Sequence, residues 1–284
     1  PFLLAQSILQ ALAVLRRRKP SLVVGMGGFA SGPGGVAAKL LGIPLVIQEQ
    51  NAIAGMTNRL LARISKAVCE AFPGTFPRSA RLHTIGNPVR ADIVGLEEPL
   101  ERYTGRSGPL QLLVIGGSLG AQALNETLPL ALARLPEGER PKTGHQAGRG
   151  KDAATRAAYT QAGVEAWVVE FIDDMAEAYA WADLVICRAG ALTVSELAAA
   201  GVAALLVPYP YAVDDHQTAN GNYLARAGAA LLIQQRDLGP ERLAGELRAL
   251  DRATLTRMAV TARSLAKPDA TARFADICEE VLAA

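Results

Sequence analysis

The chain has 284 residues, of which 50% are hydrophobic and 20% are charged, a balance typical of a globular protein with a substantial core. Its three cysteines (Cys69, Cys187 and Cys278) lie far apart and form neither a metal-binding pattern nor a disulfide framework, which fits a reducing cytoplasm. No hydrophobic run reaches the roughly 20 residues that a membrane-spanning helix needs. The composition therefore excludes a disulfide-stabilised scaffold and a transmembrane helix, and the length allows two domains.

The formal net charge of +2 hides an uneven distribution of charged residues. Residues 1–93 contain 11 Lys and Arg but 3 Asp and Glu, whereas the rest of the chain contains 18 against 24. A basic front part suggests an anionic partner, such as phosphate groups or a membrane surface. Charge that is scattered over a solvated surface explains the asymmetry equally well, so the sequence leaves both interpretations open.

Residues 1–18 have the hydrophobic spacing of a helix, which ends in a basic cluster of Arg16, Arg17, Arg18 and Lys19. Cationic side chains suit a helix C-terminus. Such a helix can pack against a core, which is the favoured interpretation, or rest on anionic lipid. Because the chain begins inside this segment, without an initiator methionine, we expect that a preceding part of the protein is absent.

A glycine-rich segment, Gly25–Val36, follows a short strand at Leu22–Val24 and leads into a helix. Glycines at such a position allow tight turns and a close approach of the backbone to a ligand. Their spacing does not match the G-x-G-x-x-G dinucleotide fingerprint, so a phosphate- or sugar-binding loop and a tight strand–helix turn are equally supported. The next strand, Pro44–Glu49, is followed by Asn51, at the strand end where open α/β sheets bind ligands. An asparagine there can also serve as a helix cap or form an Asx-turn.

Short hydrophobic strands alternate with helices along the chain, which predicts an α/β fold with parallel sheets. A charged and irregular stretch, 91–109, marks the boundary between two domains, which we place at 1–92 and 93–267, with a final helix over 268–284. We expect further strands at Ala67–Phe72, Leu82–Gly86, Leu110–Ile115, Thr143–Gln146, Ala166–Ile172, Leu184–Cys187, Ala204–Val207 and Ala230–Gln234.

Two strand–turn–helix units of the second domain are candidate anion sites. The strand Leu184–Cys187 leads through small residues into a helix that we expect to begin near Thr193. The strand Leu110–Ile115 leads into Gly116–Ala121, with a hydroxyl at Ser118. The N–H groups of a helix's first turn lack partners, and the helix dipole favours negative charge there. We therefore expect the stretch Ala182–Asn220, which contains the first of these two units, to hold the nucleotide of a sugar donor.

Two acidic features have simpler alternatives. Thr193–Glu196 matches a capping box, in which Glu196 would only bond the start of its own helix, and spacing alone favours that interpretation. Asp214 and Asp215 could hold Mg²⁺ together with a diphosphate, although a solvated acidic loop is the favoured interpretation.

Six segments of the chain form an ordered set of motifs: Phe29–Gly35, Glu49–Gly55, Gly86–Arg90, Gly116–Ala121, Glu170–Met175 and Arg188–Glu196. In this order they resemble the motifs of the MurG family of N-acetylglucosaminyltransferases, and the similarity covers nearly the whole chain. The resemblance implies the GT-B fold, two Rossmann-like parallel-sheet domains around a cleft, with the first domain incomplete here. It implies inverting transfer of N-acetylglucosamine from UDP to the 4-hydroxyl of the muramoyl sugar of undecaprenyl-pyrophosphoryl-muramoyl-pentapeptide (lipid I), which gives lipid II in peptidoglycan synthesis.

The partners that the resemblance implies are UDP-N-acetylglucosamine, lipid I and an anionic membrane surface, and they do not include nucleic acid. The expected location is the cytoplasmic face of the inner membrane, as a peripheral protein, with roles in cell shape and division. The resemblance implies no cofactor and no resident metal, although stimulation by Mg²⁺ remains compatible with it.

The resemblance also assigns donor contacts to residues of this chain. Glu196 would accept hydrogen bonds from the ribose hydroxyls, because two carboxylate oxygens suit a vicinal diol, and Ile172 would meet uracil through its backbone. Asn51 and Gln217 would bond the sugar hydroxyls. Ser118 and Arg90 would offset the negative charge that develops as UDP leaves. Main-chain N–H groups would line the nucleotide at Ala191, Leu192, Thr193, Val194 and Ser195.

The catalytic base has no candidate in this chain. The family carries it, or the group that positions it, in a glycine-rich, histidine-containing loop close to its N-terminus, and His83, His145 and His216 do not lie in such a motif. A well-placed base contributes about 10²–10⁴-fold to the rate, so we expect the chain to bind the UDP-sugar but to turn over poorly.

Four alternatives remain at this stage. A UDP-N-acetylglucosamine 2-epimerase and a glycosyltransferase for another glycolipid share the GT-B architecture. A nucleotide-sugar-binding fragment without turnover is the non-enzymatic reading. An NAD-dependent dehydrogenase is disfavoured by the irregular glycine spacing.

Overall fold

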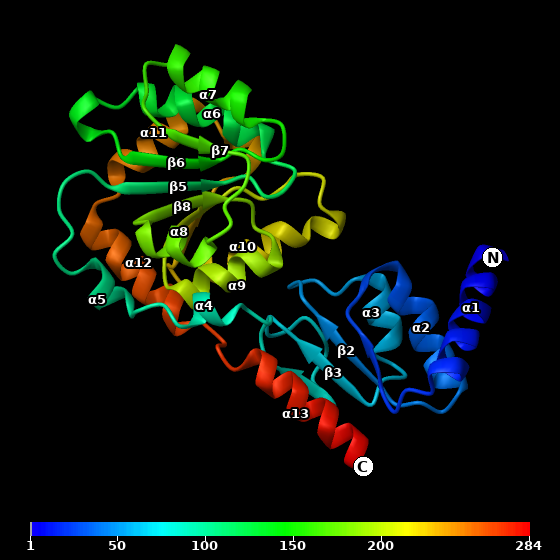
Figure 1. Ribbon diagram of the computed structural model, residues 1–284. Coiled ribbons are helices and arrows are strands. Elements are labelled where there is room, and N and C mark those ends of the chain that lie inside the picture. The colour runs from blue at the N-terminus through cyan, green and yellow to red at the C-terminus, as the bar shows by residue number, and fades with distance from the viewer. Residues whose placement is uncertain (1) are drawn as a thin grey trace. The chain divides into compact units, whose positions relative to one another are not determined.

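The computed structural model describes residues 2–284, with side chains from Leu3 onward, and the chain divides into two compact units (Figure 1). The first unit comprises the chain up to Pro88 together with Lys267–Ala284, and the second comprises Val89–Ala266. The division falls four residues before the expected boundary at 92 and one residue before the expected boundary at 267.

The first unit contains a four-stranded parallel sheet in the order β1-β2-β3-β4. Strands β2 and β3 are buried at every position, as expected of hydrophobic runs covered on both faces of a parallel sheet. The elements are α1 (Phe2–Arg18), β1 (Val23–Gly25), α2 (Gly28–Leu40), β2 (Leu45–Glu49), α3 (Met56–Leu61), β3 (Ala67–Glu70), β4 (Leu82–Thr84) and α13 (Ala270–Ala283).

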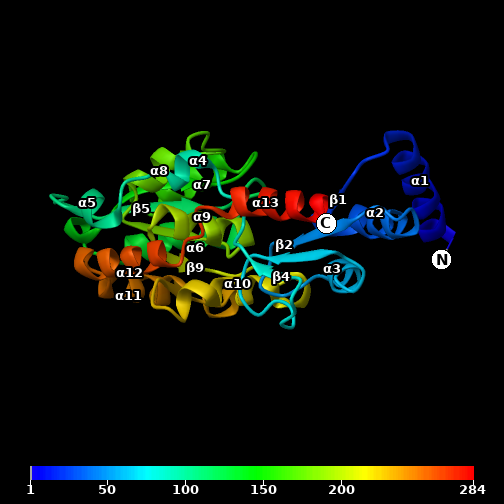
Figure 2. The ribbon, with the colours of Figure 1, turned by 90° about the horizontal axis from the view of Figure 1, so that it is seen from below.

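The last helix, α13, packs on the sheet of the first unit (Figure 2). Ile277 of this helix lies in one hydrophobic cluster with Val46 and Cys69 of the sheet. The chain passes close to itself at Gly86, where φ is +90° and an added Cβ would lie 2.4 Å from the Cβ of Lys267. Only glycine satisfies both conditions at this point.

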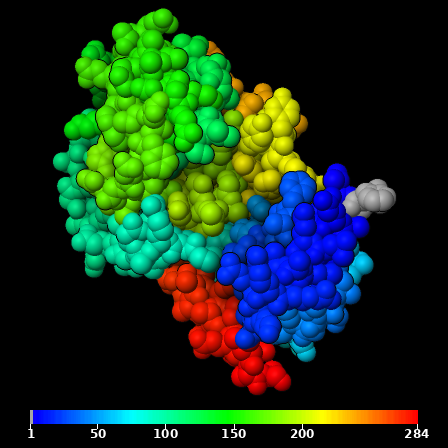
Figure 3. Space-filling model, turned by 45° about the vertical axis from the view of Figure 1, so that its right-hand side comes forward, coloured from blue at the N-terminus to red at the C-terminus, as the bar shows by residue number. Residues whose placement is uncertain are grey.

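Helix α1 packs on α2, but no side chain of residues 3–18 is buried. Leu3 and Leu9 are 80% and 66% exposed, and the basic residues Arg16, Arg17 and Arg18 close the helix. Figure 3 shows the chain's first residues, in deep blue, on the surface of this unit. The expected burial of this helix in a core is therefore wrong for its outer face. Within residues 2–284, no helix is both long and apolar enough to cross a membrane.

The second unit contains a six-stranded parallel sheet in the order β10-β9-β8-β5-β6-β7. The first strand of this sheet, β5, lies inside it. Strands β6 and β7 follow on one side of β5, and strands β8, β9 and β10 follow on the other side. The direction of winding thus reverses between β5 and β8. The sheet and its helices comprise β5 (Gln111–Ile115), α6 (Gln122–Ala133), β6 (Lys142–Gln146), α7 (Asp152–Gln161), β7 (Trp167–Val169), α8 (Met175–Trp181), β8 (Leu184–Cys187), α9 (Ala191–Ala200), β9 (Ala203–Leu206), α10 (His216–Ala225), β10 (Ala230–Leu232), α11 (Pro240–Ala249) and α12 (Arg252–Ser264).

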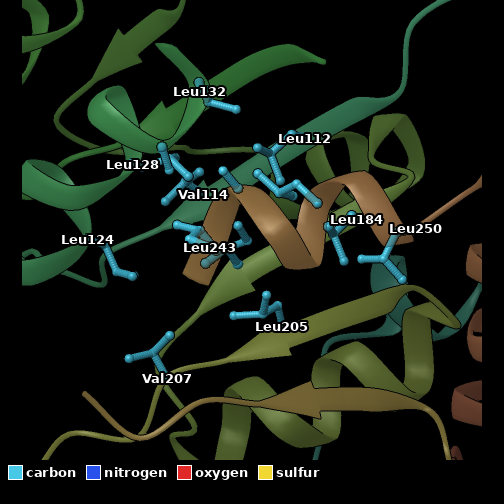
Figure 4. Close-up of a cluster of buried hydrophobic side chains, with 14 of the residues drawn as sticks. Leu112, Val114, Leu124, Leu128, Leu132, Leu184, Leu205, Val207, Leu243 and Leu250 are labelled. Carbon is cyan, nitrogen blue, oxygen red and sulfur yellow. The ribbon is translucent and has the colours of Figure 1, made fainter. Parts of the chain in front are cut away.

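One face of this sheet forms the main core of the second unit. Alternate strand residues such as Leu112, Val114 and Leu205 are at most 1% exposed and gather around Leu243 of α11 (Figure 4). Burying a leucine side chain contributes about 2 kcal/mol, so the leucines of this face add substantially to the unit's stability. Short 3₁₀ helices, η1 (Glu137–Glu139), η2 (Val213–Asp215) and η3 (Gln235–Asp237), lie in the connections.

The stretch 91–109 is not the irregular linker that its composition predicts. It contains α4 (Ala91–Val94) and α5 (Pro99–Tyr103), and the side chain of Tyr103 is 5% exposed. The buried carboxylate of Asp183 holds this segment through Arg106 at 2.6 Å and also binds Arg252 at 3.1 Å. The segment therefore belongs to the second unit, because its charges are paired with partners there.

Candidate functional site

The reversal between β5 and β8 predicts where a ligand binds in the second unit. In open α/β sheets, ligands occupy the crevice at the carboxyl ends of the strands, at the point where the winding reverses. The two loops at that point are 116–121 after β5 and 188–190 after β8. These are the two strand–turn–helix units that the sequence marked as candidate anion sites.

The loop after β5 is built by glycines that other residues could not replace. Gly117 and Gly120 have φ values of +79° and +71°, and a Cβ on Gly120 would lie 2.1 Å from the carbonyl oxygen of Ala147. Ser118 stands between them, exposed, with its own carbonyl accepting from the N–H of Arg149 at 3.2 Å. The hydroxyl of Ser118 thus lies at the carboxyl edge of the sheet.

Gln146, at the end of β6, forms hydrogen bonds to two loops, the one after β5 and the one after β7. Its Oε1 accepts from the N–H of Gly117 at 2.9 Å, and its Nε2 donates to the carbonyls of Gly117 and Glu170 at 3.0 and 2.6 Å. The side chain of Gln146 is 3% exposed. The loops that carry Ser118 and Ile172 are therefore both bonded to this one side chain. Gln146 was not predicted from the sequence, in which its only signal is that a polar residue ends a buried strand.

Ile172 lies in the loop between β7 and α8, and its side chain is 8% exposed. Asp174 ends this loop, and its Oδ1 accepts from the N–H of Glu177 at 2.8 Å to cap α8. With the side chain packed inward, the backbone of Ile172 is the part that can meet a base edge. This position stays a prediction for uracil.

Helix α9 begins at Ala191, two residues earlier than expected, after Gly190 as the N-cap. The capping-box alternative is therefore wrong, because Thr193 lies inside the first turn and no side chain caps this helix. The hydroxyl of Ser195 bonds back to the carbonyl of Ala191 at 3.0 Å. The N–H groups of Ala191, Leu192 and Thr193 are those that helix geometry leaves for a ligand.

Glu196 lies one turn into α9 and is half-buried. Its Oε2 accepts from the hydroxyl of Tyr179 at 3.0 Å. Burial raises the pKa of Glu196, while the Tyr179 hydrogen bond and the guanidinium of Arg90 act in the opposite direction. Arg90 is the N-cap of α4 and is exposed. Arg90 and Glu196 are therefore close enough for their charges to interact.

The loop after β9 is shaped by Arg188, another residue that the sequence analysis did not single out for a role. Its guanidinium donates to the carbonyls of Val207 and Pro208 at 3.1 and 3.2 Å and to Oε1 of Gln235 at 2.6 Å. It also lies 5.6 Å from the ring centroid of Tyr209. Arg188 therefore holds the start of the loop that leads to α10, the helix in which Gln217 lies.

Gln217 lies in the first turn of α10, half-buried, with its Oε1 accepting from the N–H of Tyr209 at 2.9 Å. Its Nε2 group is the half of the amide that can donate to a sugar hydroxyl. Asp214 and Asp215 precede it with φ values of +53° and +51°, and such left-handed backbone costs of order 1 kcal/mol at each non-glycine residue. Nδ1 of His216 lies 2.7 Å from the carbonyl of Val213.

The acidic pair of this loop is exposed, and Oδ1 of Asp215 accepts from the hydroxyl of Thr218 at 2.7 Å. Across residues 2–284, no group of three or more His, Cys, Asp or Glu side chains is arranged to hold a metal ion.

Asn51 is the one candidate that belongs to the first unit, where it follows β2. The carboxylate of Glu49 accepts from the N–H and Nδ2 of Asn51 at 3.0 and 3.2 Å, from the N–H of Gly55 at 3.1 Å and from Nδ2 of Asn58 at 2.9 Å. Gly55, not Asn51, is the N-cap of α3, so the helix-cap alternative for Asn51 is wrong. Glu49, which is 3% exposed, is the residue that shapes this loop.

The remaining histidines have structural positions. His145 is fully buried between the hydroxyl of Tyr159 at 2.9 Å and Oδ1 of Asn125 at 3.0 Å, and burial lowers its pKa to about 4. His83 lies in β4.

Comparison with known protein families matches both halves of the chain. Residues 111–281 match the Glycosyltransferase family 28 C-terminal domain, and residues 1–70 match the Glycosyltransferase family 28 N-terminal domain. A Marinobacter nauticus protein named UDP-N-acetylglucosamine--N-acetylmuramyl-(pentapeptide) pyrophosphoryl-undecaprenol N-acetylglucosamine transferase is 57% identical over 282 residues, 99% of this chain and 78% of that protein. A protein of the same name from Burkholderia lata is 56% identical, over 100% of this chain and 78% of that protein.

Solved structures give the same result. The crystal structure of Acinetobacter baumannii MurG is 47% identical in sequence and superposes with a TM-score of 0.90, over 99% of this chain and 79% of that chain. A UDP-GlcNAc 2-epimerase from Neisseria meningitidis superposes with a TM-score of 0.66 over 98% of this chain and 81% of that chain, but at 13% identity it shows the shared fold alone.

Proposed function

Because this chain belongs to glycosyltransferase family 28, and within it to the MurG transferases, we infer that it transfers N-acetylglucosamine from UDP-N-acetylglucosamine to lipid I, giving lipid II. The reaction is a glycosyl transfer with inversion. The 4-hydroxyl of the muramoyl sugar loses its proton and attacks the anomeric carbon, while the bond to the UDP oxygen breaks and UDP leaves with the electron pair. The family's GT-B fold matches the two parallel sheets.

One observation carries the proposal within the structure. The winding reversal, the uncapped start of α9 and the carboxylate of Glu196 occur together in the second unit. A nucleotide diphosphate needs an anion site next to an acceptor for its ribose hydroxyls, and this arrangement supplies both.

We assign the donor contacts as follows. Uracil meets the backbone of Ile172, and the ribose hydroxyls donate to Glu196. The N–H groups of α9's first turn and Ser118 meet the diphosphate, and Arg90 offsets the charge that develops on leaving UDP. Gln217 bonds a sugar hydroxyl, and for Asn51 of the first unit the contact with a sugar hydroxyl stays a prediction. On this account main-chain dipoles and a guanidinium offset the diphosphate charge, so we propose that no resident metal is needed. Chelation with EDTA should leave most of the activity.

The test of the reaction uses UDP-N-acetylglucosamine labelled in the sugar, with and without lipid I. We expect the label to move to the lipid and UDP to appear only when lipid I is present. Conversion of UDP-N-acetylglucosamine to its 2-epimer without any acceptor would contradict the proposal, as would labelling of a diacylglycerol acceptor in preference to lipid I.

The outer face of α1 supports a peripheral membrane location at the cytoplasmic face of the inner membrane. Leu3 and Leu9 of this face are 80% and 66% exposed, and a run of arginines closes the helix. Exposed apolar side chains beside cations suit an anionic lipid surface. Such a location fits a lipid-linked acceptor and a role in cell-wall growth, shape and division.

Vesicle flotation tests this location. Vesicles containing phosphatidylglycerol should carry the protein, and replacing Leu3 and Leu9 by glutamate should abolish the association without unfolding, because both side chains are exposed. Equal association with neutral phosphatidylcholine vesicles would remove the electrostatic part of the proposal, and unchanged association of the variant would remove α1 from it.

A further inference from the structure

The second unit contains a cavity whose lining includes Ile172 but none of the other residues assigned to the donor site. It measures about 650 Å³ and lies between β6, β7 and α8. Both tryptophans of the chain, Trp167 and Trp181, line it. We call it the indole cavity, defined by Gly144, Trp167, Trp181, Phe171, Asp173 and Glu177.

Strand geometry places this cavity on the sheet face opposite the main core. His145 and Val168 point toward Tyr159 and the core on one face. Successive positions of a strand alternate between faces, so the side chain of Trp167 and the bare backbone of Gly144 face the other side of the sheet. Gly144 forms the floor, because a Cβ there would lie 2.8 Å from Trp167 and 3.7 Å from Trp181.

The cavity is distinct from the nucleotide edge of the sheet. Its lining includes Lys142 and Thr143, which begin β6, whereas the nucleotide is expected at the carboxyl ends of the strands. The two places share only the loop that carries Ile172. That side chain packs toward the cavity, while its backbone is the part expected to meet uracil.

The chemistry of the lining selects a cation with an apolar body. Trp167 and Phe171 are 55% and 63% exposed, which leaves large aromatic surfaces open to a partner. Three exposed carboxylates, those of Asp173, Asp174 and Glu177, stand at the rim against one ammonium group, that of Lys142. Indole faces attract guanidinium and ammonium groups, and arginine stacks on them most readily.

We propose that the indole cavity binds a basic segment of a partner protein, in which an arginine or lysine stands beside an apolar residue. The exposed aromatic surface fits the apolar residue, and the rim carboxylates fit the cation. An anionic membrane does not suit this rim, because the rim carboxylates would repel the negatively charged lipid headgroups.

The test uses the peptide N-acetyl-Leu-Arg-Phe-Arg-amide, with N-acetyl-Leu-Glu-Phe-Glu-amide as the control. Because both tryptophans line the cavity, saturable binding should change the intrinsic fluorescence. We expect the basic peptide to bind at least roughly tenfold more tightly than the acidic one. The double variant Asp173→Asn/Glu177→Gln should weaken binding roughly tenfold, since each exposed charge pair contributes modestly. Asp174 stays unchanged because it caps α8.

The matched control is Glu137→Gln/Glu139→Gln, which removes two exposed carboxylates of η1 outside the cavity and should leave the affinity unchanged. Trp167→Ala, followed by calorimetry, should abolish most of the binding, and the exposure of this side chain keeps the risk of unfolding low. Saturating UDP should leave the peptide affinity within about threefold.

Three results would overturn the proposal. Equal affinity for both peptides, or no effect of the rim variant, would remove the charge recognition. Stoichiometric displacement of the peptide by UDP would assign the cavity to the donor site. A blue shift on phosphatidylglycerol vesicles that Trp167→Ala removes, without any peptide binding, would make this surface a membrane contact.

Discussion

Two glutamates, one in each unit, have different surroundings and therefore different uses. Glu49 ends a strand of the first unit, is 3% exposed and accepts four hydrogen bonds from its own loop. Glu196 lies on the first helix after the winding reversal of the second unit, is half-buried, and accepts from Tyr179. Glu49 uses its carboxylate to build a loop, whereas Glu196 keeps acceptor capacity at a place where a ligand's hydroxyls can donate. Burial also raises the pKa of Glu196, because the charged carboxylate is less well solvated there than in water. Such a position is typical of a functional group.

The largest expected effect tests the structural role of Glu49. Glu49→Ala should lower the free energy of unfolding of the first unit by about 4 kcal/mol, because the backbone N–H of Gly55 and the amide of Asn58 lose their buried acceptor. Hydrogen exchange of amides in β2 and β3 measures this loss. Glu49→Gln keeps one acceptor oxygen and should lose less. If Glu49→Ala leaves the first unit stable and instead weakens UDP binding, the structural role of Glu49 is contradicted.

The second prediction concerns His145, a buried group whose structural role can be tested by the pH dependence of stability. His145, like Glu49, has protein partners on both of its polar atoms, and burial lowers its pKa to about 4 from an ordinary 6.5. The unfolded chain therefore binds a proton at higher pH than the folded chain does. Stability should fall as pH drops from 6.5 through 4, by about 3 kcal/mol in total.

Urea unfolding at several pH values measures this loss. His145→Gln keeps a side chain that can donate and accept, and it should flatten the pH dependence between 6.5 and 4. A variant with the same pH dependence as the natural chain would show that other groups carry it.

The third prediction concerns ligand binding by Glu196. Glu196→Ala should weaken UDP binding by about 2 kcal/mol, roughly 30-fold in Kd, the scale of hydrogen bonds to a charged group. Calorimetry with UDP measures it, and circular dichroism controls for the fold. Glu196→Gln retains an acceptor for Tyr179 and should give an intermediate affinity. Unchanged affinity in a folded Glu196→Ala variant would leave Glu196 as a partner of Tyr179 alone.

The smallest effect belongs to the partner of Glu196. Tyr179→Phe removes the hydroxyl that orients the carboxylate and should weaken UDP binding by about 1 kcal/mol or less. The matched change Tyr159→Phe removes the hydroxyl beside His145 and should leave UDP affinity unchanged. A larger loss from Tyr159→Phe than from Tyr179→Phe would mean that general loosening, not orientation of Glu196, governs the affinity.

Sequence patterns predicted the strands well and the contacts poorly, for a physical reason. Leu184–Cys187 is a continuous hydrophobic run, and burial on both faces of a parallel sheet leaves few other ways to place it. The start of α9 was misplaced because the capping box is a local pattern, whereas the helix actually begins after Gly190. The partners Glu196–Tyr179 and Gln146–Glu170 come from different elements, so no local pattern reports them. Residues 91–109 were misread because charges that pair with a buried Asp183 look, in sequence, like charges on a linker.

The structure of the chain bound to UDP tests the central claim most directly. The account predicts the ribose hydroxyls within hydrogen-bonding distance of the Glu196 carboxylate, the uracil edge against the backbone of Ile172, and the diphosphate at the first turn of α9. A UDP molecule bound elsewhere, with Glu196 contacting only Tyr179, would contradict it.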